Sequence, residues 1–329
     1  MAKTGFFEAT AGAVERLARF YDWFSPALIG LHRLRTSVTK SLRGKDVDEK
    51  ILESRFNKGS GIRWSAYHGL ISKKWPDICS EAAYALINES CSVLEGWLED
   101  VFSREVSNNV FMAFNDEGAN SLRTKAIKYM QFPCGKECYK QVLKYLKANA
   151  PSSATFLCQS TVPALRRSLG AYTEETLENL LRYYRLIKEL RNSVVHGGGS
   201  ATKNCVGAYC GCKGLSSNDL GLTRLPCLPQ IKEGQRVNID LYTANAFVEV
   251  VLKIIKIYDI ELVESRIGVE EFKRRWMSHQ GNLVKTFSAN QSKAERQLSA
   301  WLKRFYGFKI DDIEMMRRFL SDEDLCKFG

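Results

Sequence analysis

Apolar residues recur along this chain with the spacing of amphipathic helices, and strand-like alternation is confined to a short stretch at 236–241. The pattern predicts an all-α fold. We expect the last stretch, from residue 269 onward, to hold three helices. Upstream of it, helices are predicted at 6–24, 26–42, 46–56, 78–106, 122–131, 136–146, 162–168, 173–196 and 241–257.

The helix at 173–196 has the clearest boundaries. Thr173 stands where an N-cap is expected, with Thr176 three residues later and Glu174 and Glu175 in the first turn. The run of three glycines at 197–199 predicts its end.

Composition changes divide the chain into three regions. An N-terminal helical region is expected at 1–76, with a Gly/Ser break at 58–61 and a boundary at Pro76. A central helical domain is expected at 77–265 and contains a Gly- and Cys-rich stretch at 197–235, which lacks periodicity and predicts a long loop. The third region, 266–329, is expected to be a basic helical extension.

The formal net charge is +11, and 45% of the residues are hydrophobic. The chain can therefore fill a core, and its positive charge favours a polyanionic partner, although a soluble basic protein with a solvated surface has the same charge. The first 24 residues lack the continuous apolar core of a signal peptide, and no stretch is apolar enough to cross a bilayer. We expect no membrane insertion.

Ten cysteines in 329 residues are too few for a secreted disulfide scaffold, which favours a reducing cytoplasm. Cys205, Cys210, Cys212 and Cys227 follow one another with four, one and fourteen intervening residues. Four thiolates could hold a structural zinc, but this spacing matches no common zinc-binding pattern, so free thiols are preferred. The expected function needs no cofactor.

Candidate chemistry lies at the end of the helix at 173–196. On a helical projection, Asn192 and His196 fall on a polar face, while Arg191 falls beside the apolar face, where it needs an acid or a phosphate as a partner. His196 lies in the last turn, where the carbonyls of the helix end favour a protonated imidazole. Glu95, which borders the apolar face of the helix at 78–106, is the expected partner of Arg191.

The segment Leu190-Arg191-Asn192-Ser193-Val194-Val195-His196-Gly197 resembles the Arg-Asn-x-x-x-His signature of the HEPN superfamily, near the end of a long core helix as in that family. More loosely, helix order resembles the family over 78–264. The resemblance implies a HEPN-like helical bundle, here with additional N- and C-terminal helices, that forms a homodimer in which two copies of the motif face one cleft.

The resemblance also implies a metal-independent endoribonuclease that cleaves RNA by attack of the 2′-hydroxyl, as a toxin or antiviral-defence effector, with an antitoxin or regulatory partner as a further expectation. Carried over to this chain, Arg191 and His196 would be catalytic and Asn192 would assist them. RNA contacts are expected from five basic residues: Arg185, Lys188, Lys273, Arg274 and Arg275.

Two other interpretations stay open. Arg191 could form a structural ion pair, with Asn192 at the surface and His196 closing the helix. The chain could also be a non-catalytic helical module that binds a nucleotide, RNA or a protein. Aromatic residues of the basic extension could stack on unpaired bases, but the buried face of an amphipathic helix is preferred for them: Trp276, Trp301, Phe305 and Tyr306.

Overall fold

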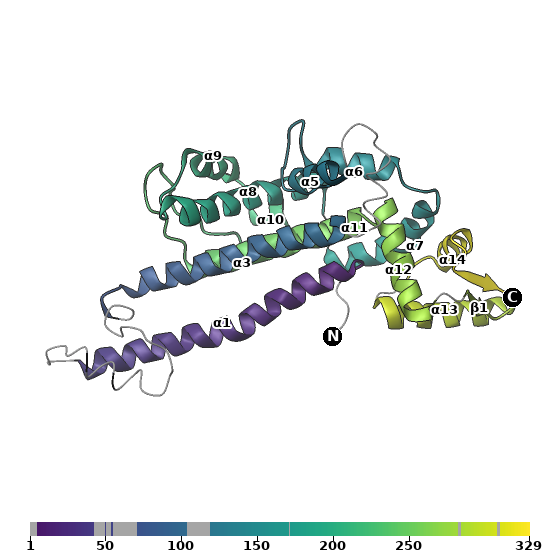
Figure 1. Cartoon of the computed structure of the whole chain (residues 1–329), viewed down its shortest axis with the longest axis horizontal. Coiled ribbons are helices and arrows are strands. Elements are labelled where there is room, and N and C mark those ends of the chain that lie inside the picture. Colours follow the sequence, from purple (N-terminus) through teal and green to yellow (C-terminus); the bar gives the residue numbers. More distant parts are fainter. Residues whose placement is uncertain are drawn as a thin grey trace.

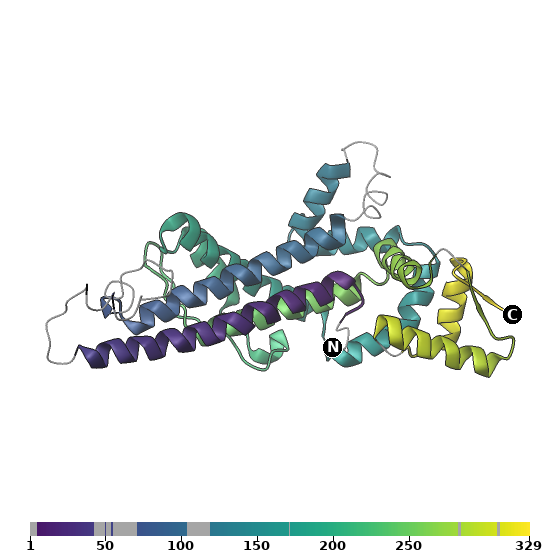
Figure 2. The same cartoon turned by 60° about the horizontal axis from the view of Figure 1, so that its bottom comes forward.

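Three long helices form the body of the molecule (Figures 1 and 2). In the computed structural model, α1 (Glu8–Ser41) lies along α3 (Trp75–Ser103), and α11 (Leu241–Glu261) packs against both. The described residues are 5–42, 50, 54, 71–103, 119–170, 172–281, 284–307 and 310–329. Their elements are almost entirely helical, which confirms the predicted all-α class.

A second layer covers the other side of α3. Helix α8 (Glu174–Gly197) packs on α3 and α11, and α9 (Lys203–Cys212) lies along the outer side of α8 (Figure 1). The short α10 (Ser217–Leu220) also contacts α8. Shorter helices lead from α3 to α8: α5 (Ala119–Tyr129), α6 (Tyr139–Ala148) and α7 (Ser153–Leu169).

The C-terminal part forms a smaller unit at one end of the long axis (Figure 1). Its strands pair in parallel, with Thr286 opposite Lys327. The unit packs on the body through α7, which contacts both α12 and α14. Its elements are α12 (Arg266–Gln280), β1 (Lys285–Phe287), α13 (Gln291–Tyr306), α14 (Ile313–Asp322) and β2 (Cys326–Phe328).

One apolar core joins the three sequence regions. The same cluster of buried residues includes Phe6 of the N-terminal region, Leu94 and Ile187 of the central region, and Leu298 and Phe319 of the C-terminal region. The regions at 1–76, 77–265 and 266–329 therefore share their buried surface.

The start of α1 is fixed by a carboxylate in the interior. Asp259 of α11 is 2% exposed and accepts hydrogen bonds from the backbone N–H groups of Phe6 (2.5 Å) and Phe7 (2.9 Å) and from the hydroxyl of Thr10. Trp97 Nε1 of α3 donates to the same Thr10 hydroxyl at 2.9 Å. An anion at a helix N-terminus satisfies backbone donors that have no partner within the helix.

Two predicted helices differ from the structure by more than a turn at an end. The predicted helices at 6–24 and 26–42 are one continuous helix, α1, with Pro26 inside it. Proline removes one backbone donor, but the helix is packed on both sides of it, through Phe24 in the shared core and through Val38 in a second apolar cluster. Pro76 lies in the first turn of α3, where helices tolerate proline. The helix predicted at 162–168 is only the end of α7.

The prediction of a long loop at 197–235 is wrong, because this stretch contains α9 and α10. Helix α9 begins at an N-cap, Thr202, whose side chain accepts a hydrogen bond from the Cys205 N–H. Glycines 207 and 211 weaken its intrinsic helix propensity, and burial of Cys205 and Cys212 compensates. Tertiary packing thus makes a helix where the sequence pattern does not show one.

The segment 236–241 forms no strand ladder. Its Val237 and Ile239 are buried as the alternation predicts, but the structure has only an isolated bridge between Ser200 and Arg236. Side chains of α3 satisfy its backbone instead: Tyr84 donates to the Val237 carbonyl at 2.8 Å, and Ser80 accepts from the Ile239 N–H at 3.3 Å. The helix predicted at 46–56, apart from residues 50 and 54, and the break at 58–61 lie outside the described residues.

Candidate active site

Both ends of α8 are built as the sequence predicts. At its start, the side chains of Thr173 and Thr176 each accept a hydrogen bond from the other's backbone N–H, which forms a capping box. At its end, Gly198 has a φ of 59° in the left-handed region, and its N–H returns to the carbonyl of Ser193. A residue without a Cβ adopts this conformation at little cost. The cap places His196 in the last turn of the helix.

Arg191 contacts the acidic partner that was predicted for it. Its Nη1 lies 3.4 Å from Glu95 Oε2 of α3, and its Nε donates to Asn88 Oδ1 at 3.1 Å. The Arg191 and Glu95 side chains are 28% and 27% exposed, so this ion pair is partly shielded from water and remains open on one side. Asn88 precedes Glu95 by two helical turns, so it lies on the same face of α3.

Lys188 shares the same carboxylate. Its Nζ lies 3.1 Å from Glu95 Oε1 and 2.5 Å from Gln131 Oε1. We call Asn88, Glu95, Lys188 and Arg191 the charge cluster. Two cations share one carboxylate there, so the cluster has a surplus positive charge that a phosphate could neutralise.

Apolar packing supports the charge cluster from below. Cys91 and Tyr184 are fully buried between α3 and α8, and the Tyr184 hydroxyl has no hydrogen-bond partner among the described residues. Burial, reinforced by the nearby Glu95, raises the pKa of the Cys91 thiol to about 12. Burial also raises the pKa of Tyr184 well above its usual value. Both groups therefore stay neutral, and their packing between α3 and α8 supports the charge cluster.

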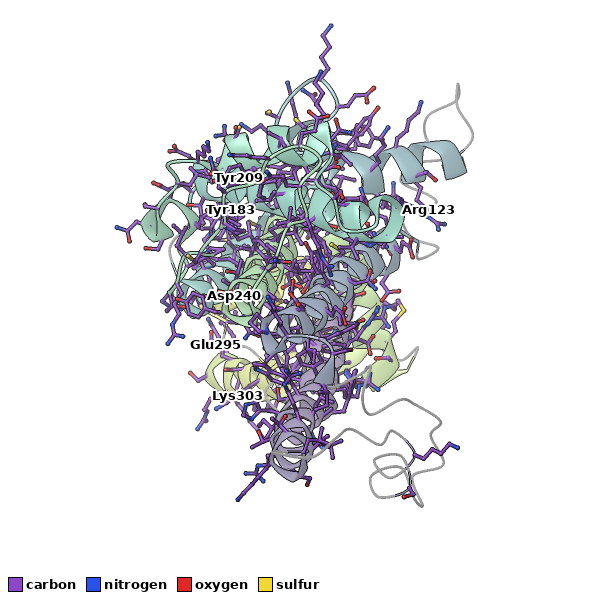
Figure 3. All side chains as sticks on the ribbon, turned by 90° about the vertical axis from the view of Figure 1, so that its left-hand side faces the viewer. Arg123, Tyr183, Tyr209, Asp240, Glu295 and Lys303 are labelled. Atoms are coloured by element: carbon purple, nitrogen blue, oxygen red, sulfur yellow. The ribbon has the colours of Figure 1, made fainter. Side chains whose placement is uncertain are left out.

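His196 lines a groove on the neighbouring face of α8. The groove has a volume of about 350 Å³ and is lined by Glu189, Asn192, His196, Thr202 and Asn204. Figure 3 looks along the long axis from the side of the molecule that carries α9, and labels Tyr183 of α8 and Tyr209 of α9. Its lining residues come from the last turns of α8 and from the start of α9, a helix that was not predicted from the sequence.

Glu189 forms the acidic part of this groove. Glu189 is only 6% exposed, and its carboxylate lies 2.7 Å from Arg185 Nη2. The Arg185 guanidinium also lies 5.3 Å from the centre of the Phe132 ring. Arg185 therefore has two partners of its own but stays partly accessible beside the groove.

Arg191 and His196 project from α8 in different directions, about 140° apart at roughly 100° per residue. The surface between them is continuous, because Asn192 is partly exposed and Val195 is 59% exposed. A single copy thus presents the two groups on different sides of α8 and does not direct them at one point.

The prediction that residues 273–275 contact RNA is wrong for Arg275, which is buried, and the other two residues form ion pairs within the chain. Arg275 is 4% exposed and donates to the backbone carbonyls of Phe6 and Phe305, so it has a structural role that links the C-terminal unit to the start of α1. Lys273 pairs with Glu323 at 2.8 Å. Arg274 forms ion pairs to two other carboxylates, those of Glu8 (2.6 Å) and Glu271 (3.0 Å).

The cysteines of the Gly- and Cys-rich stretch are not gathered into one cluster. Cys205 and Cys212 are buried and Cys210 and Cys227 are exposed, and no group of three or more His, Cys, Asp or Glu with metal-binding geometry occurs in the described parts of the chain. Burial raises the pKa of the Cys212 thiol to about 12 and also raises that of Cys205, so these two thiols pack as neutral groups.

Comparison with protein-family models, with curated proteins and with solved structures finds no match for this chain. None of the helices in the described ranges is both long enough and apolar enough to span a lipid bilayer.

Proposed function

We propose that this chain is a metal-independent endoribonuclease of the HEPN type that acts as a homodimer. The observation that carries the proposal is the charge cluster: Arg191 and Lys188 share the single carboxylate of Glu95, on the same helix end that exposes His196. A surplus positive charge and an imidazole thus lie near the same end of α8, on neighbouring faces of the helix. The resemblance of residues 190–197 to the Arg-Asn-x-x-x-His signature supports the same chemistry.

In the proposed reaction, the ribose 2′-hydroxyl attacks the neighbouring phosphorus and the bond from phosphorus to the 5′-oxygen breaks. The products are a 2′,3′-cyclic phosphate and a free 5′-hydroxyl. A neutral His196 can take the proton from the 2′-hydroxyl, and a protonated His196 can give one to the leaving 5′-oxygen. Arg191 stabilises the negative charge that develops on the phosphate, and Asn192, which lines the His196 groove, orients the imidazole or the ribose.

The exposed Val195 supports a contact between two copies. Val195 lies between Arg191 and His196 on α8 and is among the large apolar residues left open to solvent. An isologous dimer would cover both copies of Val195 and bring the two motifs together across its axis. Four groups, two guanidinium and two imidazole, would then surround one phosphodiester.

The test is cleavage of total RNA in the presence of EDTA. We expect the wild type to cleave, and Arg191→Ala and His196→Ala to lose cleavage while keeping the helical circular-dichroism signal. Arg182→Ala is the matched control, because Arg182 lies on the same helix and pairs with its own glutamate, Glu178, at 2.9 Å. Equal cleavage by the wild type and both motif variants would refute the proposal, and RNA binding without cleavage by the wild type would point to the non-catalytic module.

A mixture of the two inactive variants tests the dimer. If one cleft contains both motifs, a mixed dimer of Arg191→Ala and His196→Ala keeps one arginine and one histidine, so mixing should restore part of the activity. No restoration after subunit exchange, although the mixed dimer forms, contradicts a shared cleft.

The toxin or antiviral-defence role and the antitoxin or regulatory partner rest on the resemblance alone. Expression of the wild type in a bacterial host should arrest growth, and Arg191→Ala and His196→Ala should each relieve the arrest. Normal growth with active, soluble wild-type protein contradicts the toxin role.

A further inference from the structure

Helix α13 has two faces of opposite character. Its buried side consists of Ala294, Leu298, Leu302 and Tyr306. Its exposed side carries four cations that fall within an arc of about 100°, at roughly 100° per residue: Lys293, Arg296, Lys303 and Arg304. We call these four residues the α13 cationic face.

No residue of the α13 cationic face forms an ion pair with the part of the chain that the structure describes. Arg296 uses only Nε, which donates to the Ser292 carbonyl of its own helix at 3.2 Å, and the Arg304 guanidinium lies 5.2 Å from the Phe305 ring centre. The acid on this helix, Glu295, accepts a hydrogen bond from Gln291 at 3.0 Å. The face therefore presents unneutralised positive charge to solvent.

The neighbouring helix α12 provides the contrast. Its basic residues at 273–275 are either paired with carboxylates or buried against backbone carbonyls. Other cations of the C-terminal unit without an ion pair among the described residues, such as Arg266 and Lys327, stand singly on their elements, whereas four lie together on one face of α13. Binding of such a face to a polyanion is favourable, because the cations release the counterions condensed on the phosphates.

We propose that the α13 cationic face binds the phosphate backbone of single-stranded RNA at a distance from the cleavage site. The choice of RNA as the polyanion rests on the function proposed above. In Figures 1 and 2, α13 lies near one end of the long axis, and the C-terminal end of α8 lies toward the other. Figure 3 labels Glu295 and Lys303 on this helix at the periphery of the molecule.

Because the two surfaces are far apart, the α13 cationic face holds long substrates without touching the scissile phosphate. Its loss should raise KM for long RNA and leave kcat unchanged. RNA too short to reach from α8 to α13 should be cleaved equally well with and without the four cations.

The binding test uses the full chain with His196→Ala, which prevents cleavage, and a fluorescein-labelled unstructured RNA of about 30 nucleotides, enough for several of the 4–16-nucleotide sites typical of single-strand binders. The test variant adds Lys293→Gln, Arg296→Gln, Lys303→Gln and Arg304→Gln. The matched control instead adds Arg33→Gln, Lys40→Gln, Lys144→Gln and Arg224→Gln, which are also exposed cations without an ion pair in the described ranges. Removing four charges lowers the wild-type formal net charge from +11 to +7 in both sets.

We expect the α13 variant to bind about tenfold or more weakly at low salt, and the control to bind nearly as well as its parent. The slope of log affinity against log salt should fall in magnitude by up to about 3, since each phosphate contact on a single strand contributes about 0.7. Equal weakening by both variants, or an unchanged slope, overturns the proposal. Loss of binding to anionic phosphatidylserine vesicles with unchanged RNA binding overturns it in favour of a membrane surface.

This binding assay and the cleavage assay fail independently. If His196→Ala cleaves like the wild type, the proposed nuclease site is wrong, and the binding comparison is then made with 2′-O-methyl RNA, which lacks the attacking 2′-hydroxyl. If both motif variants lose cleavage but the α13 variant binds RNA like its parent, only the α13 proposal is wrong.

Discussion

Arg191 is held by contacts that prepare it for a phosphate without saturating it. Glu95 divides its carboxylate between Lys188 and Arg191, and Asn88 fixes the Nε side of the guanidinium. A bound phosphate could therefore accept hydrogen bonds from Arg191 without leaving Glu95 unpaired, because Lys188 remains. The cost of exchanging one partner for another is smaller than that of breaking an isolated buried pair.

Glu95→Gln tests this positioning role. The neutral amide of this variant cannot form either ion pair, so Arg191 loses its orientation, and we expect kcat for RNA cleavage to fall about tenfold with little change in KM. Glu99→Gln, which changes an exposed glutamate on the same helix, is the matched control and should cleave like the wild type. An increase in rate for Glu95→Gln would instead mean that Glu95 restrains Arg191.

Among individual residues, the sequence predicts contacts between the faces of two amphipathic helices better than contacts with particular backbone carbonyls. The contact between Arg191 and Glu95 follows from two amphipathic helix faces, because each residue borders its own apolar stripe. The burial of Arg275 could not be predicted, since its acceptors are the carbonyls of Phe6 and Phe305, which come from separate parts of the chain. The apolar periodicity of a sequence describes one helix at a time and does not show which backbone carbonyls from other segments will contact that helix.

Among the elements, α8 and α9 show which helices a pattern can detect. Helix α8 has a capping box, a continuous apolar stripe and a glycine end, so its boundaries follow from the sequence. Helix α9 is short and contains two glycines, and it depends on α8 for its burial. Thr202 and Asn204, which line the groove beside His196, were missed with it, although the Thr202 N-cap was a usable signal.

A pair of glycine substitutions separates the two roles of glycine in this region. Gly198→Ala should lower the free energy of unfolding by about 1 kcal/mol, because an L-residue is strained at a φ of 59°. Gly207→Ala should raise it by about 0.5–1 kcal/mol, because position 207 is helical and a Cβ there meets no atom within 4 Å. Chemical denaturation measures both, and stabilisation by Gly198→Ala would contradict the proposed role of this helix end.

Over the whole molecule, the carboxylate of Asp259 joins α11 to the start of α1 and, through Thr10, to Trp97 of α3. Burial raises its pKa to about 6, against the hydrogen bonds from Thr10, Phe6 and Phe7, which lower it. The folded protein therefore binds this proton more tightly than the unfolded chain, whose value is near 3.8. Asp259 should favour folding below pH 4 and lose this contribution as the pH rises to about 6.

Asp259→Asn should remove this pH dependence. A pKa shift of about two units corresponds to about 3 kcal/mol, most of which is present at pH 4, so the stability difference between the wild type and Asp259→Asn should change by about 2 kcal/mol between pH 4 and pH 7. The variant should also be less stable at both values, because its amide N–H faces a backbone or hydroxyl donor. A difference that is the same at pH 4 and pH 7, measured by denaturant unfolding, contradicts the raised pKa.

The apolar core that runs from Phe6 to Phe319 bears on how this chain melts. Regions that share one apolar core cannot stay folded separately, because unfolding one of them exposes the buried side chains of the others. Calorimetry should accordingly record a single heat-absorption peak, and limited proteolysis should yield no long-lived fragment covering only the first or last region. A destabilising substitution at either end of the long axis should therefore lower the one melting temperature of the whole chain, without any conformational change that connects the two ends.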